Sequence, residues 1–329
     1  MPDKRIVSGM RPTGRLHLGN LHGALHNWID LQNSGLYECF YFIADWHALT
    51  SDYAQTEQLS SYRHDILIDW LSVGLDPARC VLFIQSAIKE HAELYLLLGM
   101  ITPFPWLERN PTYKEMKSEL VDRDLSTLGF IGYPVLQAAD IIMYKAHGVP
   151  VGADQLPHIE LTREIVRRFH HLYREIFPIP EPLLANFPKI LGIDGRKMSK
   201  SYDNAIYLSD RGDILMQKVA SMFTDPQRQR RSDPGRPEIC NVFTFHGIYS
   251  DPDMQKRIEY ECSHAEIGCT DCKKILAEYL LKAMEPIHER QYYYDSHPGE
   301  VRDIIANGNE RASAIARATM EEVRKAIRI

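Results

Sequence analysis

Short apolar runs that alternate with segments of helical periodicity constrain the fold of this chain most strongly. Residues 38–44 and 80–84 are nearly continuous apolar runs, which are typical of strands buried on both faces of a sheet. Between them, apolar side chains recur at helical spacing, at Leu59, Tyr62, Ile66, Trp70 and Val73. Because strands that alternate with helices form parallel sheets, we expect an α/β fold with a doubly wound parallel sheet.

Polar residues follow two of the predicted strands. Asp45 and His47 come directly after the run 38–44, and Asp154 and Gln155 follow a short strand predicted at 149–151. Open α/β sheets bind their ligands beyond the carboxyl ends of the strands. The sequence therefore predicts a ligand site at that edge of the sheet.

A glycine-containing loop joins another predicted strand, residues 5–9, to a helix that begins near Gly19. Backbone N–H groups at such a helix start favour phosphate, and a glycine allows close approach of a nucleotide. His17 and Asn20 lie at this helix start and are expected to donate hydrogen bonds to phosphate. The alternative is that Asn20 only caps the helix and that His17 is a surface histidine.

Residues 195–201 read Gly-Arg-Lys-Met-Ser-Lys-Ser and follow a proline-rich connection. Lys197 and Lys200 are compact positive charges suited to a triphosphate, and two small hydroxyls, of Ser199 and Ser201, can also donate to phosphate oxygens. The alternative interpretation is a solvated basic loop.

Asp140 interrupts an otherwise apolar helix predicted at 133–144, with Pro134 near the start of that helix, where proline is tolerated. A buried carboxylate is costly unless other groups donate hydrogen bonds to it. Asp140 is therefore a candidate binding residue. The alternatives are that it faces solvent or pairs with an arginine.

The composition sets limits on location and partners. The chain has 329 residues, with 44% hydrophobic and 25% charged residues, which is enough for two domains of a globular protein. It contains no run of about 18 apolar residues that would cross a membrane, and no signal-peptide core follows Met1, so we expect a cytoplasmic protein. A net charge of −6 requires that any RNA site be a local basic patch, for which the four arginines of residues 227–236 are candidates.

The pattern changes at two places along the chain. Residues 102–130 carry several prolines and charged residues, and are predicted to be an insertion in which Lys114 and Lys117 could add charge to the site. Residues 205–329 are expected to be mostly helical, and the last helix is expected to begin near Glu310.

Four of the six cysteines lie close together in the sequence, at Cys240, Cys262, Cys269 and Cys272, with the spacing C-x21-C-x6-C-x2-C. Four thiolates suit a [4Fe–4S] cluster or a structural zinc ion, and the spacing alone does not separate the two. The remaining alternative is a set of free, buried cysteines.

Over nearly its whole length the chain resembles the bacterial tryptophanyl-tRNA synthetases, which are class I aminoacyl-tRNA synthetases. The string Lys-Met-Ser-Lys-Ser at 197–201 is similar to the second signature of that class, and residues 13–20 occupy the place of the first, usually written His-Ile-Gly-His. The other matching strings are residues 8–14, 44–50, 133–140, 149–152 and 158–163.

The resemblance implies a Rossmann-like catalytic domain over residues 1–204 and a helical anticodon-binding domain over residues 205–329, in a homodimer. It implies that L-tryptophan reacts with ATP, with Mg²⁺, to give tryptophanyl-adenylate and diphosphate, and that the tryptophanyl group then passes to tRNA(Trp). Neither a membrane nor DNA is an expected partner. Some members carry a [4Fe–4S] cluster beside the anticodon site on a nearly identical cysteine spacing, which favours iron over zinc here.

The resemblance also implies residue roles. Lys197, Lys200, His17 and Asn20 are expected to be catalytic. The implied ATP contacts are Arg11, Pro12, Thr13, Gly19, Asn20, Gly152, Ala153, Asp154, Ile190, Lys197, Met198, Ser199, Lys200 and Ser201. The implied tryptophan contacts are Asp140, Tyr133, Gln137, His47 and Gln155. The chain departs from the commonest family patterns at Asn20, Arg11 and Ala153, and the last of these removes a carboxylate.

Three other functions compete with this interpretation. Tyrosyl-tRNA synthetases share the fold, nucleotidylyltransferases use a similar first signature, and a non-catalytic RNA-binding protein could retain the scaffold. The complete 197–201 string disfavours the second, and intact His17, Lys197 and Lys200 disfavour the third. Tryptophan is expected rather than tyrosine, because an indole N–H only donates and Asp140 supplies the acceptor. The substrate is in turn expected to satisfy Asp140.

Overall fold

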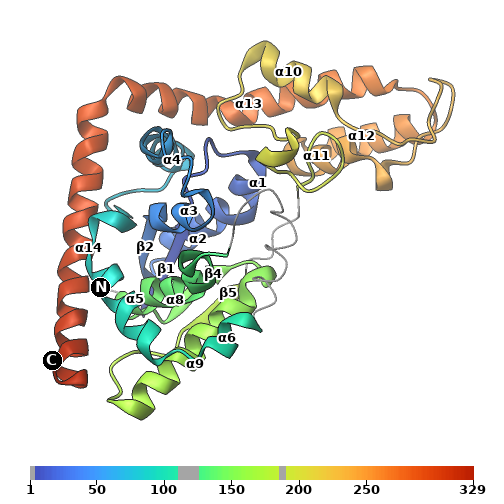
Figure 1. The fold of residues 1–329 in the computed structure, drawn as a ribbon. Helices are drawn as coiled ribbons and strands as arrows, with labels where there is room; N and C mark the ends of the chain where they lie inside the picture. Colours follow the sequence, from blue (N-terminus) through green and yellow to red (C-terminus); the bar gives the residue numbers. More distant parts are fainter. Residues whose placement is uncertain (1–3, 110–125, 185–189) are drawn as a thin grey trace. The chain divides into compact units, whose positions relative to one another are not determined.

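The computed structural model describes residues 4–109, 126–184 and 190–329, and the chain divides into two compact units (Figure 1). The first unit comprises Met1–Gly14, His26–Asn186 and Ser296–Ile329, and the second comprises Arg15–Leu25 and Phe187–Asp295. Lys114 and Lys117, in the predicted insertion, lie outside the described residues.

A parallel sheet of five strands forms the centre of the first unit, in the order β3-β2-β1-β4-β5. The strands are β1 (Lys4–Met10), β2 (Tyr37–Ile43), β3 (Cys80–Ile84), β4 (Gly148–Val151) and β5 (Glu181–Leu184). In the register, Val7 of β1 pairs with Phe40 of β2, which pairs with Val81 of β3. This arrangement confirms the predicted doubly wound parallel sheet.

Strand β5 was not predicted from the sequence. It has only four residues and contains Pro182, so it resembles the proline-rich connection around it. Proline has no N–H group to donate across a sheet and is therefore restricted mainly to edge strands. β5 lies at the edge of the sheet, next to β4, where Pro182 is tolerated.

In the first unit, helices connect the strands of the sheet along the chain, and one further helix ends the chain. They are α2 (His26–Ser34), α3 (Asp45–Asp52), α4 (Leu59–Val73), α5 (Glu90–Ile101), α6 (Phe104–Glu108), α8 (Leu128–Met143), α9 (Leu156–Leu172) and α14 (Pro298–Ile327). The core contains Phe40 and Phe83 from the strands and Leu94 and Ile142 from α5 and α8. Complete burial of such a side chain contributes roughly 1.5–3 kcal/mol, so this core is a main source of stability.

Helix α8 begins earlier than predicted. The Thr127 hydroxyl accepts a hydrogen bond from the Phe130 N–H at 3.2 Å and caps the helix, which starts at Leu128. The sequence suggested that Pro134 lies near the start of the helix. In the structure it lies inside the helix instead. The helix loses the hydrogen bond that proline cannot donate, but it buries 12 of its 16 residues, and this packing offsets the loss.

Helix α14 also begins earlier than predicted, at Pro298, and it packs on β3 of the first unit. A Cβ added at Gly308 would lie 1.7 Å from the Leu82 carbonyl oxygen, so only glycine permits this approach. The next residue, Asn309, accepts a hydrogen bond from the Ile84 N–H at 2.9 Å. Because α14 packs here, residues 296–329 belong to the first unit, and the compact units do not coincide with the expected boundary at residue 204.

The second unit is mostly helical, as expected for the residues beyond 205. Its elements include α1 (Leu18–Asn20), the π-helical turn η1 (Leu21–Leu25), α10 (Gly212–Ser221), η5 (Pro237–Ile239), α11 (Asn241–Tyr249), α12 (Pro252–Ser263) and α13 (Cys269–Ser296). Leu215, Phe245 and Leu280 are completely buried in it. In the part of the chain that the structure describes, no helix is long and apolar enough to span a membrane.

Candidate active site

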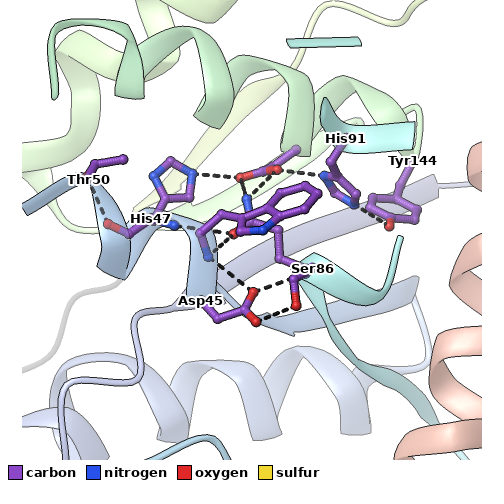
Figure 2. Close-up of polar contacts among 9 residues, drawn as sticks. Asp45, His47, Thr50, Ser86, His91 and Tyr144 are labelled. Atoms are coloured by element: carbon purple, nitrogen blue, oxygen red, sulfur yellow. Dashed lines mark hydrogen bonds and ion pairs between the residues drawn. The ribbon is translucent and has the colours of Figure 1, made fainter. Parts of the chain in front are cut away.

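A buried carboxylate with three protein donors lies in the first unit (Figure 2). Asp140 of α8 is 0% exposed. Its Oδ2 lies 2.7 Å from His47 Nε2, its Oδ1 lies 2.6 Å from His91 Nδ1, and Gln85 Nε2 donates to both oxygens at 2.8 and 2.9 Å. Asp140 thus neither faces solvent nor pairs with an arginine. The protein itself supplies donors to both oxygens, so the carboxylate does not depend on a substrate for its hydrogen bonds. That the substrate also donates to Asp140 stays a prediction.

These donors keep Asp140 ionised. Burial by itself would raise the pKa of Asp140, but the hydrogen bonds from His47 and His91 oppose burial and hold this pKa below its usual value. The orientation of the Gln85 amide is also fixed, because its Oε1 accepts from the backbone N–H groups of Trp46 and His47 at 3.1 and 3.4 Å. The NH₂ group of Gln85 therefore faces Asp140.

A second carboxylate holds the elements that carry these donors. Asp45, at the start of α3, accepts hydrogen bonds from the Ser86 N–H at 3.0 Å and the Ser86 hydroxyl at 2.5 Å, and from Arg63 Nη1 at 3.1 Å. Ser86 lies in the 3₁₀ turn η2 (Gln85–Ala87), directly after β3. Asp45 therefore ties the helix that carries His47 to the turn that carries Gln85 (Figure 2).

Two of the predicted tryptophan contacts meet at His158. The Tyr133 hydroxyl lies 2.8 Å from His158 Nε2, and Gln155 Oε1 lies 2.9 Å from His158 Nδ1. Gln155 Nε2 donates to Asp154 at 3.1 Å, so its Oε1 faces the histidine and accepts. His158 is then neutral, with its proton on Nδ1 and with Nε2 accepting from Tyr133. Gln137 lies half-buried on α8, between Tyr133 and Asp140.

The pKa of His158 predicts a pH dependence of stability. Burial and, secondarily, nearby His47 lower the pKa of His158 from 6.5 to about 4, against an opposing effect of Asp154. The unfolded chain binds this proton more readily, so the contribution to stability is complete above pH 6.5 and is lost as the pH falls towards 4. The variant His158→Gln lacks this titrating group. Between pH 6.5 and pH 4, its free energy of unfolding should therefore fall by about 3 kcal/mol less than that of the wild type.

Urea unfolding of the wild type and variant at several pH values measures this difference. His171→Gln, which changes an exposed histidine of the same helix, is the matched control and should retain the wild-type slope. Equal slopes for the wild type and His158→Gln would show that His158 is not held neutral in the folded protein.

The predicted nucleotide contacts of the first unit follow neighbouring strands. Arg11, Pro12 and Thr13 follow β1, and Gly152, Ala153 and Asp154 follow β4, which pairs with β1. Arg11 Nη1 donates to the Ser51 hydroxyl at 3.3 Å. A Cβ added at Gly152 would lie 2.5 Å from Asp154 Oδ1, so a larger residue there would displace the Asp154 side chain. The exposed loops at this sheet edge are where a ligand is expected.

The two sequence signatures meet within the second unit. The Gly19 N–H donates to Met198 Sδ at 3.4 Å, and burial, with a smaller effect of the Lys200 charge, lowers the pKa of His17 to about 4. His17 Nδ1 accepts from the Asn20 N–H at 3.2 Å, and the His17 N–H donates to Asn20 Oδ1 at 3.0 Å. Asn20 therefore does take part in capping the helix, while its role towards phosphate stays a prediction. His17 is buried and is not a surface histidine.

Capping leaves donors on both residues. Because His17 Nδ1 accepts and the ring is neutral at pH 7, its proton is on Nε2. Asn20 accepts through Oδ1, so its donating end is the NH₂ group. Each side chain can therefore cap α1 and still donate a hydrogen bond to an anion.

Asn204 organises the second signature and was not predicted as a site residue. Its Oδ1 accepts from the Ser199 N–H at 2.8 Å, and its Nδ2 donates to Asp194 at 2.8 Å and to the Lys197 carbonyl at 3.1 Å. Gly195 has φ +82°, a conformation that favours glycine. The loop is thus held in one shape, with Lys197 exposed, Lys200 half-buried, and Met198 and Ile190 buried.

The four clustered cysteines also lie in the second unit. Arg228 Nη1 lies 3.6 Å from Cys262 Sγ and 4.0 Å from Cys269 Sγ. Burial and the neighbouring thiols of Cys240, Cys262 and Cys269 raise the pKa of Cys272 to about 12, against a smaller opposing effect of Arg228. Among the described residues, no group of three or more His, Cys, Asp or Glu side chains is arranged to hold a metal ion.

Comparisons with known proteins identify the family. Residues 2–285 match the family model described as tRNA synthetases class I (W and Y). The tryptophan–tRNA ligase of Thermotoga maritima is 53% identical over 326 residues, which cover 99% of each chain, and that of Aquifex aeolicus is 46% identical over 99% of this chain and all of that one.

A solved structure shows the same arrangement of the chain. The tryptophanyl-tRNA synthetase of Campylobacter jejuni, in complex with ADP and tryptophan, has a TM-score of 0.91 at 32% identity and is matched over 99% of this chain and all of that one. This chain therefore belongs to the class I tRNA synthetases for tryptophan and tyrosine, and within them to the tryptophan–tRNA ligases.

Proposed function

We propose that this chain joins L-tryptophan to tRNA(Trp) in two steps. The tryptophan carboxylate attacks the α-phosphorus of ATP in line and forms tryptophanyl-adenylate, and diphosphate leaves. The terminal adenosine of the tRNA then takes the tryptophanyl group, and AMP leaves. Because the attacking carboxylate is already ionised, the first step needs no general base. Catalysis then consists of positioning and of stabilising the negative charge on the phosphates.

The observation that carries this proposal is the buried anion of Asp140. An indole N–H only donates, and a carboxylate is the strongest acceptor that a side chain offers. Of the two histidine donors, His47 has a side chain 12% exposed, whereas that of His91 is 0% exposed. We therefore propose that tryptophan enters on the His47 side and that its indole N–H binds Asp140 there. Tyr133, Gln137 and Gln155 complete the proposed tryptophan contacts.

For the nucleotide, we propose that Lys200 and Lys197 stabilise the leaving diphosphate and that His17 Nε2 and the Asn20 NH₂ group donate to phosphate oxygens. The ADP bound by the C. jejuni enzyme supports a nucleotide site in this family. Mg²⁺ would accompany ATP as part of the substrate and neutralise phosphate charge. The other proposed ATP contacts are Arg11, Pro12, Thr13, Gly19, Gly152, Ala153, Asp154, Ile190, Met198, Ser199 and Ser201.

The test of the complete reaction is ATP-dependent transfer of labelled tryptophan to tRNA. Acid-precipitable label should appear only when ATP, tRNA and the protein are all present. Label that appears without ATP, or tyrosine transferred as efficiently as tryptophan, would contradict the proposal.

We propose a second copy of the chain and tRNA as the macromolecular partners. Exposed apolar side chains on α5, α6 and the start of α8 support a homodimer, since such groups are usually covered; they are Leu96, Met100, Phe104 and Leu128. The helices of residues 205–295 are proposed to contact the anticodon, without α14, which packs in the first unit. Because tRNA(Trp) is charged for protein synthesis, we propose that the protein acts in the cytoplasm.

We further propose that the four cysteines hold a [4Fe–4S] cluster. A Cβ added at Gly235 would lie 2.4 Å from Cys262 Sγ, so glycine leaves the space that the sulfur needs. Each thiolate of such a cluster binds a different iron, so the cysteines stand farther apart than around a single zinc ion. What supports the proposal here is that all four cysteines belong to the second unit. Its proposed role is structural, beside the anticodon site, where Lys273 and Lys274 could contact RNA.

Protein purified without oxygen should be brown and contain about four irons and four sulfides per chain. Cys269→Ser should lower the iron content, because it removes one ligand. Cys80→Ser, which changes a buried cysteine of strand β3, should retain the wild-type content. Iron and sulfide analysis of anaerobic samples checks this, and stoichiometric zinc without iron would contradict it.

A further inference from the structure

A buried histidine and a buried tyrosine stand behind the Asp140 carboxylate. His91 lies in the first turn of α5, and Tyr144 directly follows α8; both are 0% exposed. His91 Nδ1 lies 2.6 Å from Asp140 Oδ1, and His91 Nε2 lies 2.7 Å from the Tyr144 hydroxyl (Figure 2). The three side chains therefore form a chain of hydrogen bonds that ends on the carboxylate.

The direction of these hydrogen bonds follows from the tyrosine. In the described part of the chain, the Tyr144 hydroxyl has no hydrogen-bond partner other than His91 Nε2. Burial and the negative charges of Asp140 and Glu90 raise the pKa of Tyr144 well above its usual value, so the hydroxyl keeps its proton. It then donates to His91 Nε2. His91 Nε2 consequently accepts, and His91 Nδ1 donates to Asp140.

Aromatic rings surround this chain of hydrogen bonds. The rings of Phe42 and Phe83 have centroids 6.3 Å from that of His91, and Phe40 and Phe83 lie 5.1 Å from Tyr144. In such apolar surroundings a hydrogen bond is stronger than in water, and an unpaired polar group costs more. The tautomer of His91 is therefore firmly set by Tyr144.

We propose that His91 and Tyr144 are positioning residues that hold Asp140 as a fixed anion and so determine the selectivity of the site for an amino acid that carries an indole N–H. Through its Nδ1, His91 holds one oxygen of the carboxylate in a fixed direction, and the carboxylate stays an anion that can accept from the substrate. Without the Tyr144 hydroxyl, His91 Nε2 loses its partner, and the ring can change tautomer or turn. Either change alters the hydrogen bond from His91 to Asp140 and weakens Asp140 as a fixed acceptor. The inference rests on the proposed binding of tryptophan by Asp140.

The test compares two substrates of nearly the same shape in amino acid-dependent pyrophosphate exchange. One is L-tryptophan, and the other is its benzothiophene analogue, in which sulfur replaces the indole N–H. For Tyr144→Phe, the ratio of kcat/KM for tryptophan to that for the analogue should fall about tenfold, a difference of about 1.4 kcal/mol. The change should appear in the KM for tryptophan, with the values for the analogue nearly unchanged.

Tyr41→Phe is the matched control, because Tyr41 is equally buried and its hydroxyl donates to the Trp28 carbonyl at 2.9 Å. It removes one buried hydroxyl that has no contact with Asp140, and it should leave the ratio at the wild-type value. Two variants of His91 distinguish a role in orienting Asp140 from a role in filling space. His91→Asn retains an N–H group on the Asp140 side and should keep a higher ratio than His91→Leu.

The outcomes separate this inference from the proposed function. If the wild type supports no exchange with tryptophan, the proposed function fails. If the wild type prefers tryptophan but Tyr144→Phe lowers kcat/KM equally for both substrates, the pair has only a structural role and the inference is wrong. An equal fall of the ratio in Tyr41→Phe would also overturn it.

Discussion

Replacing Lys200 by alanine should slow tryptophanyl-adenylate formation roughly 10²–10³-fold, because a charged contact to a developing negative charge is worth about 2.7–4 kcal/mol. Negative charge on the diphosphate grows as the bond to the α-phosphorus breaks, so a lysine near that group acts mainly on the transition state. The affinity for tryptophan should be little changed. Single-turnover kinetics of adenylate formation, with a separate measurement of tryptophan binding, check both expectations.

Arg196→Ala is the matched control for Lys200→Ala. It removes one positive charge from the same loop, but the Arg196 side chain is exposed and pairs with Asp194 at 2.7 Å. Its rate should stay near that of the wild type. An unchanged kcat for Lys200→Ala, with only a higher KM for ATP, would show that the lysine binds the ground state and transition state equally.

Changing Asp140 should remove tryptophan affinity and selectivity together. In Asp140→Asn, a neutral amide replaces the anion, and a hydrogen bond to a charged group is worth about 1.5–3 kcal/mol, so the affinity should fall by at least about tenfold. Asp140→Ala should also destabilise the protein, because the N–H groups of His47, Gln85 and His91 would lose their acceptor. Calorimetric titration of each folded variant with tryptophan and with tyrosine measures both effects.

The control for Asp140→Asn is Asp225→Asn. Asp225 is a buried carboxylate of the second unit that pairs with Arg236 at 2.6 Å. Its replacement should lower stability without changing the binding of tryptophan. An Asp140→Asn variant that binds tryptophan as tightly as the wild type would exclude Asp140 as the indole acceptor.

Four of the five strands were predictable from the sequence, because a local run of apolar residues marks each of them. β3 has the predicted bounds, and β1, β2 and β4 differ from the predictions by only one or two residues, because their apolar runs are buried on both faces. β5 has no such pattern, and its order beside β4 is a result of tertiary packing. The early start of α14 carried a signal that could have been used, because proline is favoured at the first position of a helix and Pro298 occupies it.

In the candidate site, too, local sequence pattern identified some residues, whereas others could be recognised only from the folded structure. Asp140 was identified because a carboxylate in an apolar helix needs partners, but the partners come from three separate segments of the chain. Gln85 carried one signal that could have been used, since it directly follows β3 at the ligand-binding edge of the sheet. His91 and Asn204 carried none, because their roles arise only when distant segments meet.

Exchange of labelled pyrophosphate into ATP, measured with each amino acid in turn, tests the central claim most directly. It reports the reversible formation of an adenylate and needs no tRNA. The account predicts that tryptophan supports rapid exchange and that tyrosine gives no more label in ATP than a sample without amino acid. Exchange with tyrosine equal to that with tryptophan, or no exchange with tryptophan at all, would contradict it.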